Sequence, residues 1–209
     1  MHPPEAVEFP CGIYIRSGAE SLAWEFDTQI IKYANLMEGY EMEIERKYRI
    51  KHIPGELNQY KYKKIEQGYL CHKPTIRIRK SNEDYILTYK SKFGIEKKGE
   101  KEAIINNEVE LPLTEEAYLT LKYKTDGNII HKTRYLIPLE DDLTAELDIF
   151  EQQLQGLVFV EVEFPDEKSA DEFTPPEWFA EELSFDKRYS NYNLSKLSGL
   201  IELVGENGE

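Results

Sequence analysis

Charged and apolar residues alternate along a series of short segments between Met42 and Phe164, with turn residues between several of them. In a β-strand, side chains two positions apart share a face, so each segment would have one charged face and one apolar face. We expect strands at about residues 42–50, 67–72, 75–81, 84–91, 103–111, 129–137, 144–151 and 157–164. Successive strands with few helices between them favour an antiparallel sheet.

The expected fold is mainly β (α+β in class): a closed antiparallel β-barrel of about eight strands, enough to surround a small ligand, with a few flanking helices. Thr114 is the expected N-cap of a helix that ends near Tyr123. Pro175 should begin a short C-terminal helix, and residues 194–201 are expected to form a last one. Five aromatic residues should cover the apolar outer face: Tyr123, Tyr135, Phe159, Trp178 and Phe179.

The charged faces are segregated by sign. The acids that alternate with apolar residues are Glu43, Glu45, Glu108, Glu110, Glu146, Asp148, Glu161 and Glu163, and the bases are Arg77, Arg79, Lys90, Lys132 and Arg134. For any one strand, the alternation is also what a half-buried sheet with a solvent face shows. Like charges along one strand face repel, however, and a solvent face has no need of them. The pattern is explained if the acids gather around cations and the bases around an anion.

The chemistry of these residue types supports such a charged interior. Mg²⁺ and Mn²⁺ prefer oxygen ligands, and Mg²⁺ is commonly bound by a few carboxylates, water and substrate phosphate. Arginine and lysine neutralise phosphate oxygens, arginine with paired hydrogen bonds. Unpaired ions in a dry interior would cost several kcal/mol each, so the interior should be a wet tunnel, open at one end at least.

Composition excludes several classes of protein. The formal net charge is −14, which argues against a nucleic-acid partner. No run of about 18 apolar residues suggests a membrane span, and the start of the chain lacks the pattern of a signal peptide. Cys11 and Cys71 are too few for a disulfide framework. We expect a cytoplasmic protein with no membrane partner, either a monomer or a homodimer.

Residues 1–41 differ from the rest, with seven acidic residues against Arg16 and Lys32, and one helix expected over about 19–36. We expect this segment to be an acidic accessory extension, or the product of a start codon assigned too far upstream. An extra helix packed on the barrel is the alternative. Residues 42–201 would form the barrel domain, and residues 202–209 a flexible tail.

A set of short motifs resembles the CYTH superfamily, the triphosphate tunnel metalloenzymes. The set comprises Glu43-Ile44-Glu45-Arg46-Lys47, Gln67-Gly68-Tyr69-Leu70, Arg77-Ile78-Arg79, Tyr85-Ile86-Leu87-Thr88-Tyr89-Lys90, Lys132-Thr133-Arg134-Tyr135, Glu146-Leu147-Asp148-Ile149-Phe150, Gly156-Leu157-Val158, Glu161-Val162-Glu163 and Asp186-Lys187-Arg188-Tyr189. The first motif alone is weak, but the order and spacing of the set are specific, and it covers about residues 42–200. The sequence departs from the family where Asn106-Asn107 replace the usual arginine before Glu108.

The resemblance implies an eight-stranded tunnel, a requirement for Mg²⁺ or Mn²⁺, and a small-molecule substrate with a triphosphate. By motif match, Glu43, Glu45, Glu161 and Glu163 would bind metal, with Glu108, Glu110, Glu146 and Asp148 in support. Arg77, Arg79, Lys90, Lys132, Arg134 and Arg188 would bind phosphate. Lys47 and Tyr69 match a pair that orients and activates the attacking water in short bacterial members.

The implied reaction is metal-dependent hydrolysis of the terminal phosphate of a linear triphosphate, with inorganic tripolyphosphate as the first choice of substrate. Three alternatives stay open. A class IV adenylyl cyclase would form cyclic AMP from ATP and needs an adenine pocket. A thiamine triphosphatase would use an aromatic platform. A non-catalytic polyphosphate-binding module would bind without turnover.

Overall fold

The computed structural model describes residues 7–8, 14–15, 41–91 and 104–204. The chain divides into two units, Met1–Tyr40 and Glu41–Glu209. In the first unit, strands β1 (Val7–Glu8) and β2 (Tyr14–Ile15) pair antiparallel. The helix expected over residues 19–36 lies outside the described residues, and the accessory role of residues 1–41 stays a prediction.

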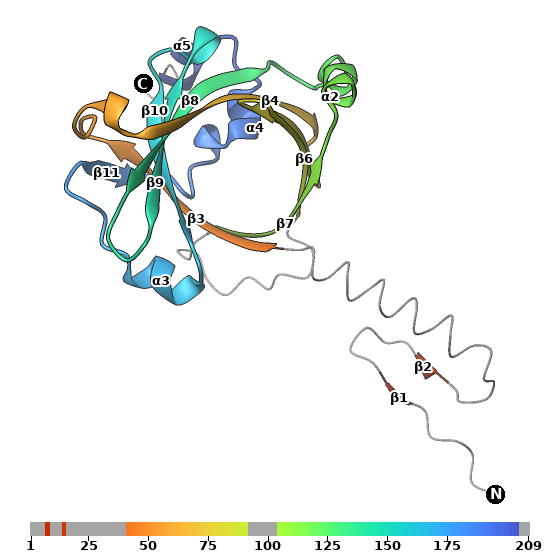
Figure 1. Cartoon of the computed structure of the whole chain (residues 1–209), viewed down its shortest axis with the longest axis horizontal. Helices are drawn as coiled ribbons and strands as arrows, with labels where there is room; N and C mark the ends of the chain where they lie inside the picture. Colours follow the sequence, from red (N-terminus) through yellow and green to blue (C-terminus); the bar gives the residue numbers. More distant parts are fainter. Residues whose placement is uncertain (1–6, 9–13, 16–40, 92–103, 205–209) are drawn as a thin grey trace, which may run out of the picture. The chain divides into compact units, whose positions relative to one another are not determined.

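The second unit is built on one antiparallel sheet that curves round on itself (Figure 1). In the described part of the chain its strands are β3 (Glu41–Ile50), β4 (Lys61–Cys71), β5 (Thr75–Ser81), β6 (Asp84–Ser91), β7 (Ile104–Pro112), β8 (Ile130–Pro138), β9 (Thr144–Phe150), β10 (Val158–Phe164) and β11 (Phe179–Glu182). Their order is β10-β9-β8-β4-β5-β6-β7-β3-β11, and β10 pairs additionally with β3.

Strand β3 has three neighbours. β7 pairs with Glu41 to Glu45, and β10 pairs with Ile44 to Tyr48. β11 pairs with Tyr48 and Ile50, so it must follow β7 along the same edge of β3. The expected closed barrel of eight strands is therefore corrected to a curved sheet of nine described strands. The ninth arises because β7 leaves part of the β3 edge without a partner, and β11 supplies one.

Few helices accompany the sheet: α2 (Glu115–Lys122), α3 (Glu167–Glu172), α4 (Asn191–Leu194) and α5 (Leu200–Val204), with 3-10 turns η1 (Leu57–Gln59), η2 (Gln152–Leu154) and η3 (Lys187–Tyr189). The expected cap of α2 is confirmed, since the Thr114 side chain accepts a hydrogen bond from the Ala117 amide. The helix expected from Pro175 is wrong, because the chain there leads into β11. None of the helices among the described residues combines the length and the apolar character that a membrane span would need.

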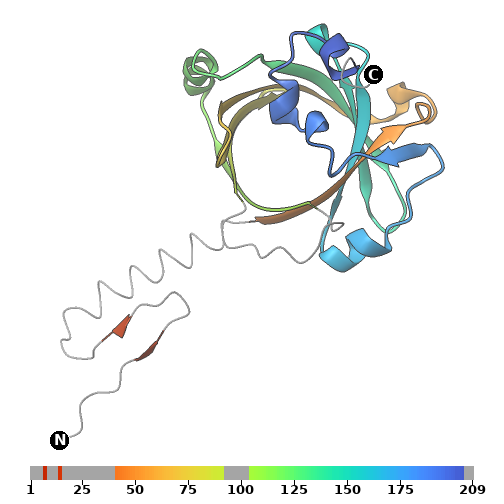
Figure 2. The same cartoon turned by 180° about the vertical axis from the view of Figure 1, so that it is seen from behind.

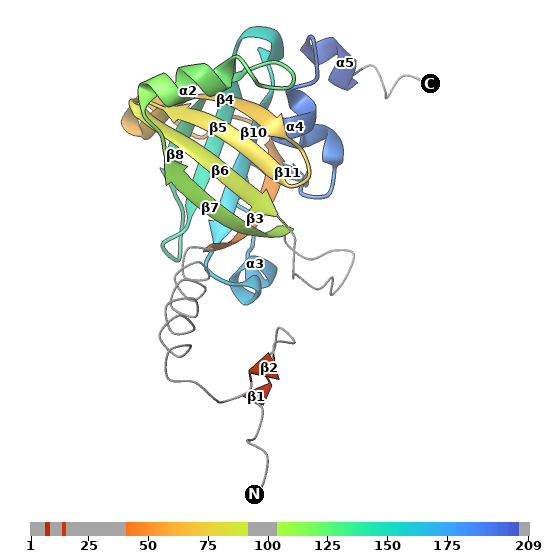
Figure 3. The ribbon, with the colours of Figure 1, turned by 90° about the vertical axis from the view of Figure 1, so that its right-hand side faces the viewer.

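Apolar side chains gather in two clusters. The first contains Ile44, Tyr48, Leu147, Val160 and Val162, which alternate with the charged residues of β3, β9 and β10, and it packs against Phe179 and Trp178 as expected. It also includes Ala170 of α3, so α3 covers part of this outer face (Figure 3).

The second cluster closes one end of the curved sheet. Ile130, Phe150 and Phe159 pack there with Tyr189 of η3 and Leu194 of α4. The ribbon of α4, in blue, lies across that end (Figure 2). Phe159 shares its strand face with Glu161, so placing it on the outer face was wrong. Tyr123 was also misplaced, since it is 92% exposed. The inner face of the sheet thus changes from charged to apolar towards the C-terminal segment.

Candidate active site

Strand register brings the alternating charged residues together as cross-strand neighbours. Lys90 lies opposite Glu108, and Arg134 lies opposite Asp148. Glu161 lies opposite both Lys47 on β3 and Glu146 on β9. Directly opposed residues lie on one face with their Cβ atoms about 5 Å apart. The charged faces of separate strands therefore form a continuous inner surface.

One group of charges is centred on Arg134, and we call it the Arg134 network: Lys47, Lys132, Arg134, Glu146, Asp148 and Glu161. The Arg134 guanidinium donates to both oxygens of Asp148, at 2.7 Å each, and to Glu161 Oε2 at 2.5 Å. It also pairs with Glu146. Lys132 Nζ lies 2.5 Å from Asp148 Oδ2. The network is deeply buried, since the side chains of Asp148 and Lys132 are 0% and 2% exposed.

Burial and neighbouring charges set the protonation of this network. Burial lowers the pKa of Lys132, and Arg134 lowers it further, to about 8. Burial alone would raise the pKa of Glu161, but Lys47 and Arg134 reverse the effect and hold it well below its usual value. Glu161 is therefore an ionised carboxylate at neutral pH.

A second group lies on the strands of the other side, and we call it the Arg77 network: Glu43, Arg77, Arg79, Lys90, Glu108 and Glu110. Arg77 Nη2 lies 3.2 Å from Glu108 Oε1, and Lys90 Nζ lies 2.9 Å from Glu108 Oε2. Lys90 also pairs with Glu43, and Arg79 with Glu110. The buried Thr88 hydroxyl links Arg77 to Glu110, with 3.2 Å contacts to each.

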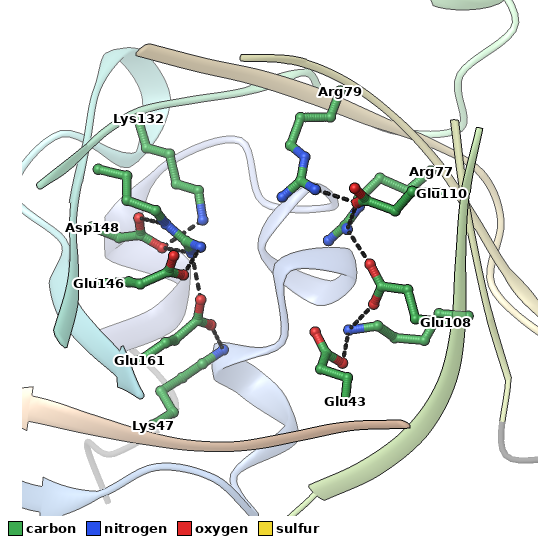
Figure 4. Close-up of polar contacts among 12 residues, drawn as sticks. Glu43, Lys47, Arg77, Arg79, Glu108, Glu110, Lys132, Glu146, Asp148 and Glu161 are labelled. Carbon is green, nitrogen blue, oxygen red and sulfur yellow. Dashed lines mark hydrogen bonds and ion pairs between the residues drawn. The ribbon is translucent and has the colours of Figure 1, made fainter. Parts of the chain in front are cut away.

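The two networks face each other across the interior of the sheet (Figure 4). Each combines three bases with three acids, so each is close to neutral by itself. Within the described part of the chain, the Nε groups of Arg77 and Arg79 are nevertheless buried without a hydrogen-bond acceptor. A buried donor without an acceptor costs free energy, so the Arg77 network favours an incoming anion.

Glu45 and Glu163 complete the acidic set. They lie directly opposite each other on β3 and β10, and neither makes an ion pair with any residue that the structure describes. Burial raises the pKa of Glu163 to about 7, with repulsion from Glu146 adding to it. Burial likewise raises the pKa of Glu43 to about 8, with repulsion from Glu45 adding to it. Glu45 and Glu163 therefore lie between β3 and β10 without a basic partner among the described residues, and Glu43 and Glu163 hold protons that a cation would displace.

These three glutamates fit a divalent cation chemically, because such a cation takes carboxylate oxygens and would relieve their repulsion. In their present positions, no three acidic, histidine or cysteine side chains of the described residues are close enough to hold an ion. Metal binding would therefore require the glutamate side chains to turn towards one another.

Lys47 and Tyr69 are both buried but do not contact each other among the described interactions. Lys47 Nζ lies 2.8 Å from Glu161 Oε1 and 3.0 Å from the Tyr189 carbonyl oxygen. The Tyr69 hydroxyl accepts a hydrogen bond from Gln67 at 2.9 Å. Burial raises the pKa of Tyr69, so its phenol is protonated at neutral pH.

Arg188 does not join either network through its described contacts. It lies in η3, where its Nη2 is 2.6 Å from Asp186 Oδ2. Thr88 and Gln67 are buried polar residues of the inner face to which the sequence analysis assigned no role. Thr88 is two positions from Lys90, and Gln67 is two positions from Tyr69, so each pair shares a strand face. This spacing was the signal that could have identified them.

No family model matches the sequence. An inorganic triphosphatase of Nitrosomonas europaea is 37% identical over 158 residues, which cover 73% of this chain and 96% of that protein. An inorganic triphosphatase of Acetivibrio thermocellus is 33% identical over 137 residues, covering 65% of this chain and 85% of that protein.

A solved structure agrees. The crystal structure of the inorganic triphosphatase NE1496 matches with a TM-score of 0.53 and 35% identity, covering 73% of this chain and 93% of that one. The fold and the charged inner face thus define a hydrolase of the triphosphatase class. Given the identity and coverage, the chain belongs to the inorganic triphosphatase family.

Proposed function

We propose that this protein hydrolyses inorganic triphosphate to phosphate and pyrophosphate at the inner face of its curved sheet. The observation that carries the proposal is the facing pair of networks, in which bases from β5, β6 and β8 stand across the interior from one another. Membership of the inorganic triphosphatase family supports it.

The bases would bind the substrate. In this proposal Arg77, Arg79 and Lys90 hold one part of the triphosphate, and Lys132 and Arg134 hold another. The free Nε groups of Arg77 and Arg79 support this role, because they can donate to phosphate oxygens without giving up an existing bond. Phosphoryl transfer depends mainly on positioning and on neutralising charge, which these side chains supply.

The acids would hold divalent cations. Glu43, Glu45, Glu161 and Glu163 are the proposed ligands, with Glu108, Glu110, Glu146 and Asp148 in support. The supporting observation is that Glu45 and Glu163 lie opposite each other without a basic partner among the described residues. A bound Mg²⁺ or Mn²⁺ would neutralise phosphate oxygens and make a bound water more acidic.

Lys47 would orient the attacking water. Burial alone would lower the pKa of its ammonium, but Glu161 and Glu45 outweigh burial and raise it. Lys47 therefore stays charged at neutral pH and acts as a hydrogen-bond donor. Tyr69, protonated and at the inner face, is the proposed second member of this pair.

Product analysis tests the function directly. Purified protein is incubated with tripolyphosphate, ATP or thiamine triphosphate, each with Mg²⁺ or Mn²⁺, and products are separated. We expect phosphate and pyrophosphate from tripolyphosphate, with the highest kcat/KM of the three substrates. Cyclic AMP from ATP would support the cyclase instead, and binding without turnover would support a non-catalytic module.

Matched variants on β5 test the site. Arg77→Ala should lower kcat/KM for tripolyphosphate by about 100-fold or more, since it removes a charged partner of the substrate. Lys80→Ala is the control, because Lys80 lies on the same strand with the opposite parity. Equal activity of the two variants would show that Arg77 does not bind substrate.

A further inference from the structure

We infer that Ser184, held by Glu182 and Arg46, is a positioning residue that fixes Lys47 for the hydrolytic reaction. The inference rests on the proposed function, because it concerns the position of Lys47, which is assigned to that reaction. On one edge of β3, the pairing with β7 ends before the pairing with β11 begins.

The gap between these two pairings lies at Lys47. β7 pairs with β3 as far as Glu45, and β11 begins to pair at Tyr48. The residues that follow β11 fill the gap. The Lys47 amide donates to Ser184 Oγ at 2.9 Å, and the Lys47 carbonyl accepts from the Leu183 amide at 2.7 Å. A side chain therefore takes the place of a strand partner at this one residue.

The Ser184 hydroxyl is itself oriented by a second contact. It donates to Glu182 Oε1 at 2.6 Å, and a hydroxyl has only one hydrogen to give. Its lone pair is thus left to accept from the Lys47 amide. Ser184 is buried, so water does not compete easily for this arrangement.

Glu182 is held in turn from the outer face of β3. Arg46 donates to both of its oxygens, with Nε at 3.0 Å and Nη2 at 2.6 Å. Arg46 Nη1 also donates to the Ala170 carbonyl at 2.9 Å. Arg46 precedes Lys47 and points to the opposite face. The contacts therefore run from an outer ion pair, through Ser184, to the backbone of the inner-face lysine.

The same C-terminal segment also holds the far end of Lys47. Its Nζ donates to the Tyr189 carbonyl at 3.0 Å and lies 4.5 Å from the centre of the Phe159 ring. With Glu161 at 2.8 Å, the ammonium has a fixed place at the border between the charged and the apolar interior. Fixing the backbone and the ammonium together leaves little freedom in where Lys47 points.

Steady-state kinetics of the full-length protein with tripolyphosphate test the inference. Ser184→Ala should lower kcat about tenfold with KM changed less than about twofold, because misplacement affects the reacting geometry more than substrate binding. Ser184→Thr keeps the hydroxyl and should restore most of kcat. Ser195→Ala is the matched control: Ser195 is also buried, but its hydroxyl donates to the Tyr192 carbonyl. Unchanged kcat in Ser184→Ala, or an equal loss in Ser195→Ala, would overturn the inference.

Amide hydrogen exchange provides a readout that needs no activity. The Lys47 amide should exchange faster in Ser184→Ala and keep its wild-type rate in Ser195→Ala. If the wild-type protein fails to hydrolyse tripolyphosphate, the proposed function fails, while the exchange rates still decide whether Ser184 holds Lys47. Should Ser184→Ala not fold, Glu182→Gln replaces it, with a several-fold loss of kcat expected; wild-type kcat in that variant would reject the inference.

Discussion

Glu45 on β3 and Glu163 on β10 form a cross-strand pair of two carboxylates. Like charges placed directly opposite each other destabilise a sheet by about 0.2–1 kcal/mol. At pH 8.5 without metal, Glu163→Gln should therefore raise the free energy of unfolding by a similar amount. It should also abolish most of the rise in Tm that Mn²⁺ gives the wild type.

Glu181→Gln is the control for that variant, because Glu181 is an exposed acid of β11 that pairs with Arg49. Thermal unfolding with EDTA and with Mn²⁺ measures both effects. If Glu163→Gln is less stable than the wild type without metal, or keeps the full rise in Tm with Mn²⁺, Glu163 does not bind the metal.

Metal binding should depend on pH. Glu163 and Glu43 have pKa values raised to about 7 and about 8, so a cation must displace their protons at neutral pH. The affinity for Mn²⁺, measured by titration calorimetry, should rise from pH 6 to pH 9. Because raised acid pKa values favour the protonated folded state, the metal-free protein should lose stability as pH rises from 4.5 to about 8, and the loss should level off above that. An affinity independent of pH would contradict both assignments.

The Arg134 network should be a large contributor to stability. Arg134→Met removes the base that Glu146, Asp148 and Glu161 share. Three acids are then left with two lysines, Lys132 and Lys47, so one buried negative charge lacks compensation. Breaking such a pair costs about 3–5 kcal/mol. Denaturant unfolding should show this loss, whereas Lys168→Met, at the exposed ion pair with Glu172, should change stability by about 0–1 kcal/mol.

Thr88 should matter to the Arg77 network through its hydroxyl. Thr88→Val keeps the shape of the side chain but removes the contacts to Arg77 and Glu110, both at 3.2 Å. We expect a loss of about 1–3 kcal/mol in stability and a higher KM for tripolyphosphate, because Arg77 is less well held. Thr133→Val is the control, since the Thr133 hydroxyl bonds Glu151 outside both networks. A KM that rises equally in both variants would show that the Thr88 hydroxyl has no specific role in substrate binding.

Much of the sheet was predictable because strand parity is a local property. Alternation from Glu43 to Lys47 and from Glu161 to Glu163 set which residues share a face, and the register of β3 with β10 made them neighbours. The first half of β4 was missed because its lysines are exposed and its alternation is weak. Phe159 could have been assigned to the inner face by counting from Glu161.

Other features depend on contacts that no local pattern encodes. β11 is only four residues long and follows two prolines, so its sequence favoured a helix start. It is a strand because β7 leaves an edge of β3 open, more than a hundred residues earlier in the chain. The position of Ser184 likewise depends on a hydrogen bond to that edge of β3, at Lys47. The pairing of acids with bases in two separate networks likewise depends on the three-dimensional curvature of the sheet.

The three neighbours of β3 have a consequence for synthesis of the protein. This strand is made before every strand that borders it, since those lie at residues 104–112, 158–164 and 179–182. A strand with open edges is prone to pair with other chains until its own partners arrive, and distant pairing slows folding. The charged inner residues of β3 would then hinder aggregation while the chain is still on the ribosome, well before they meet any substrate.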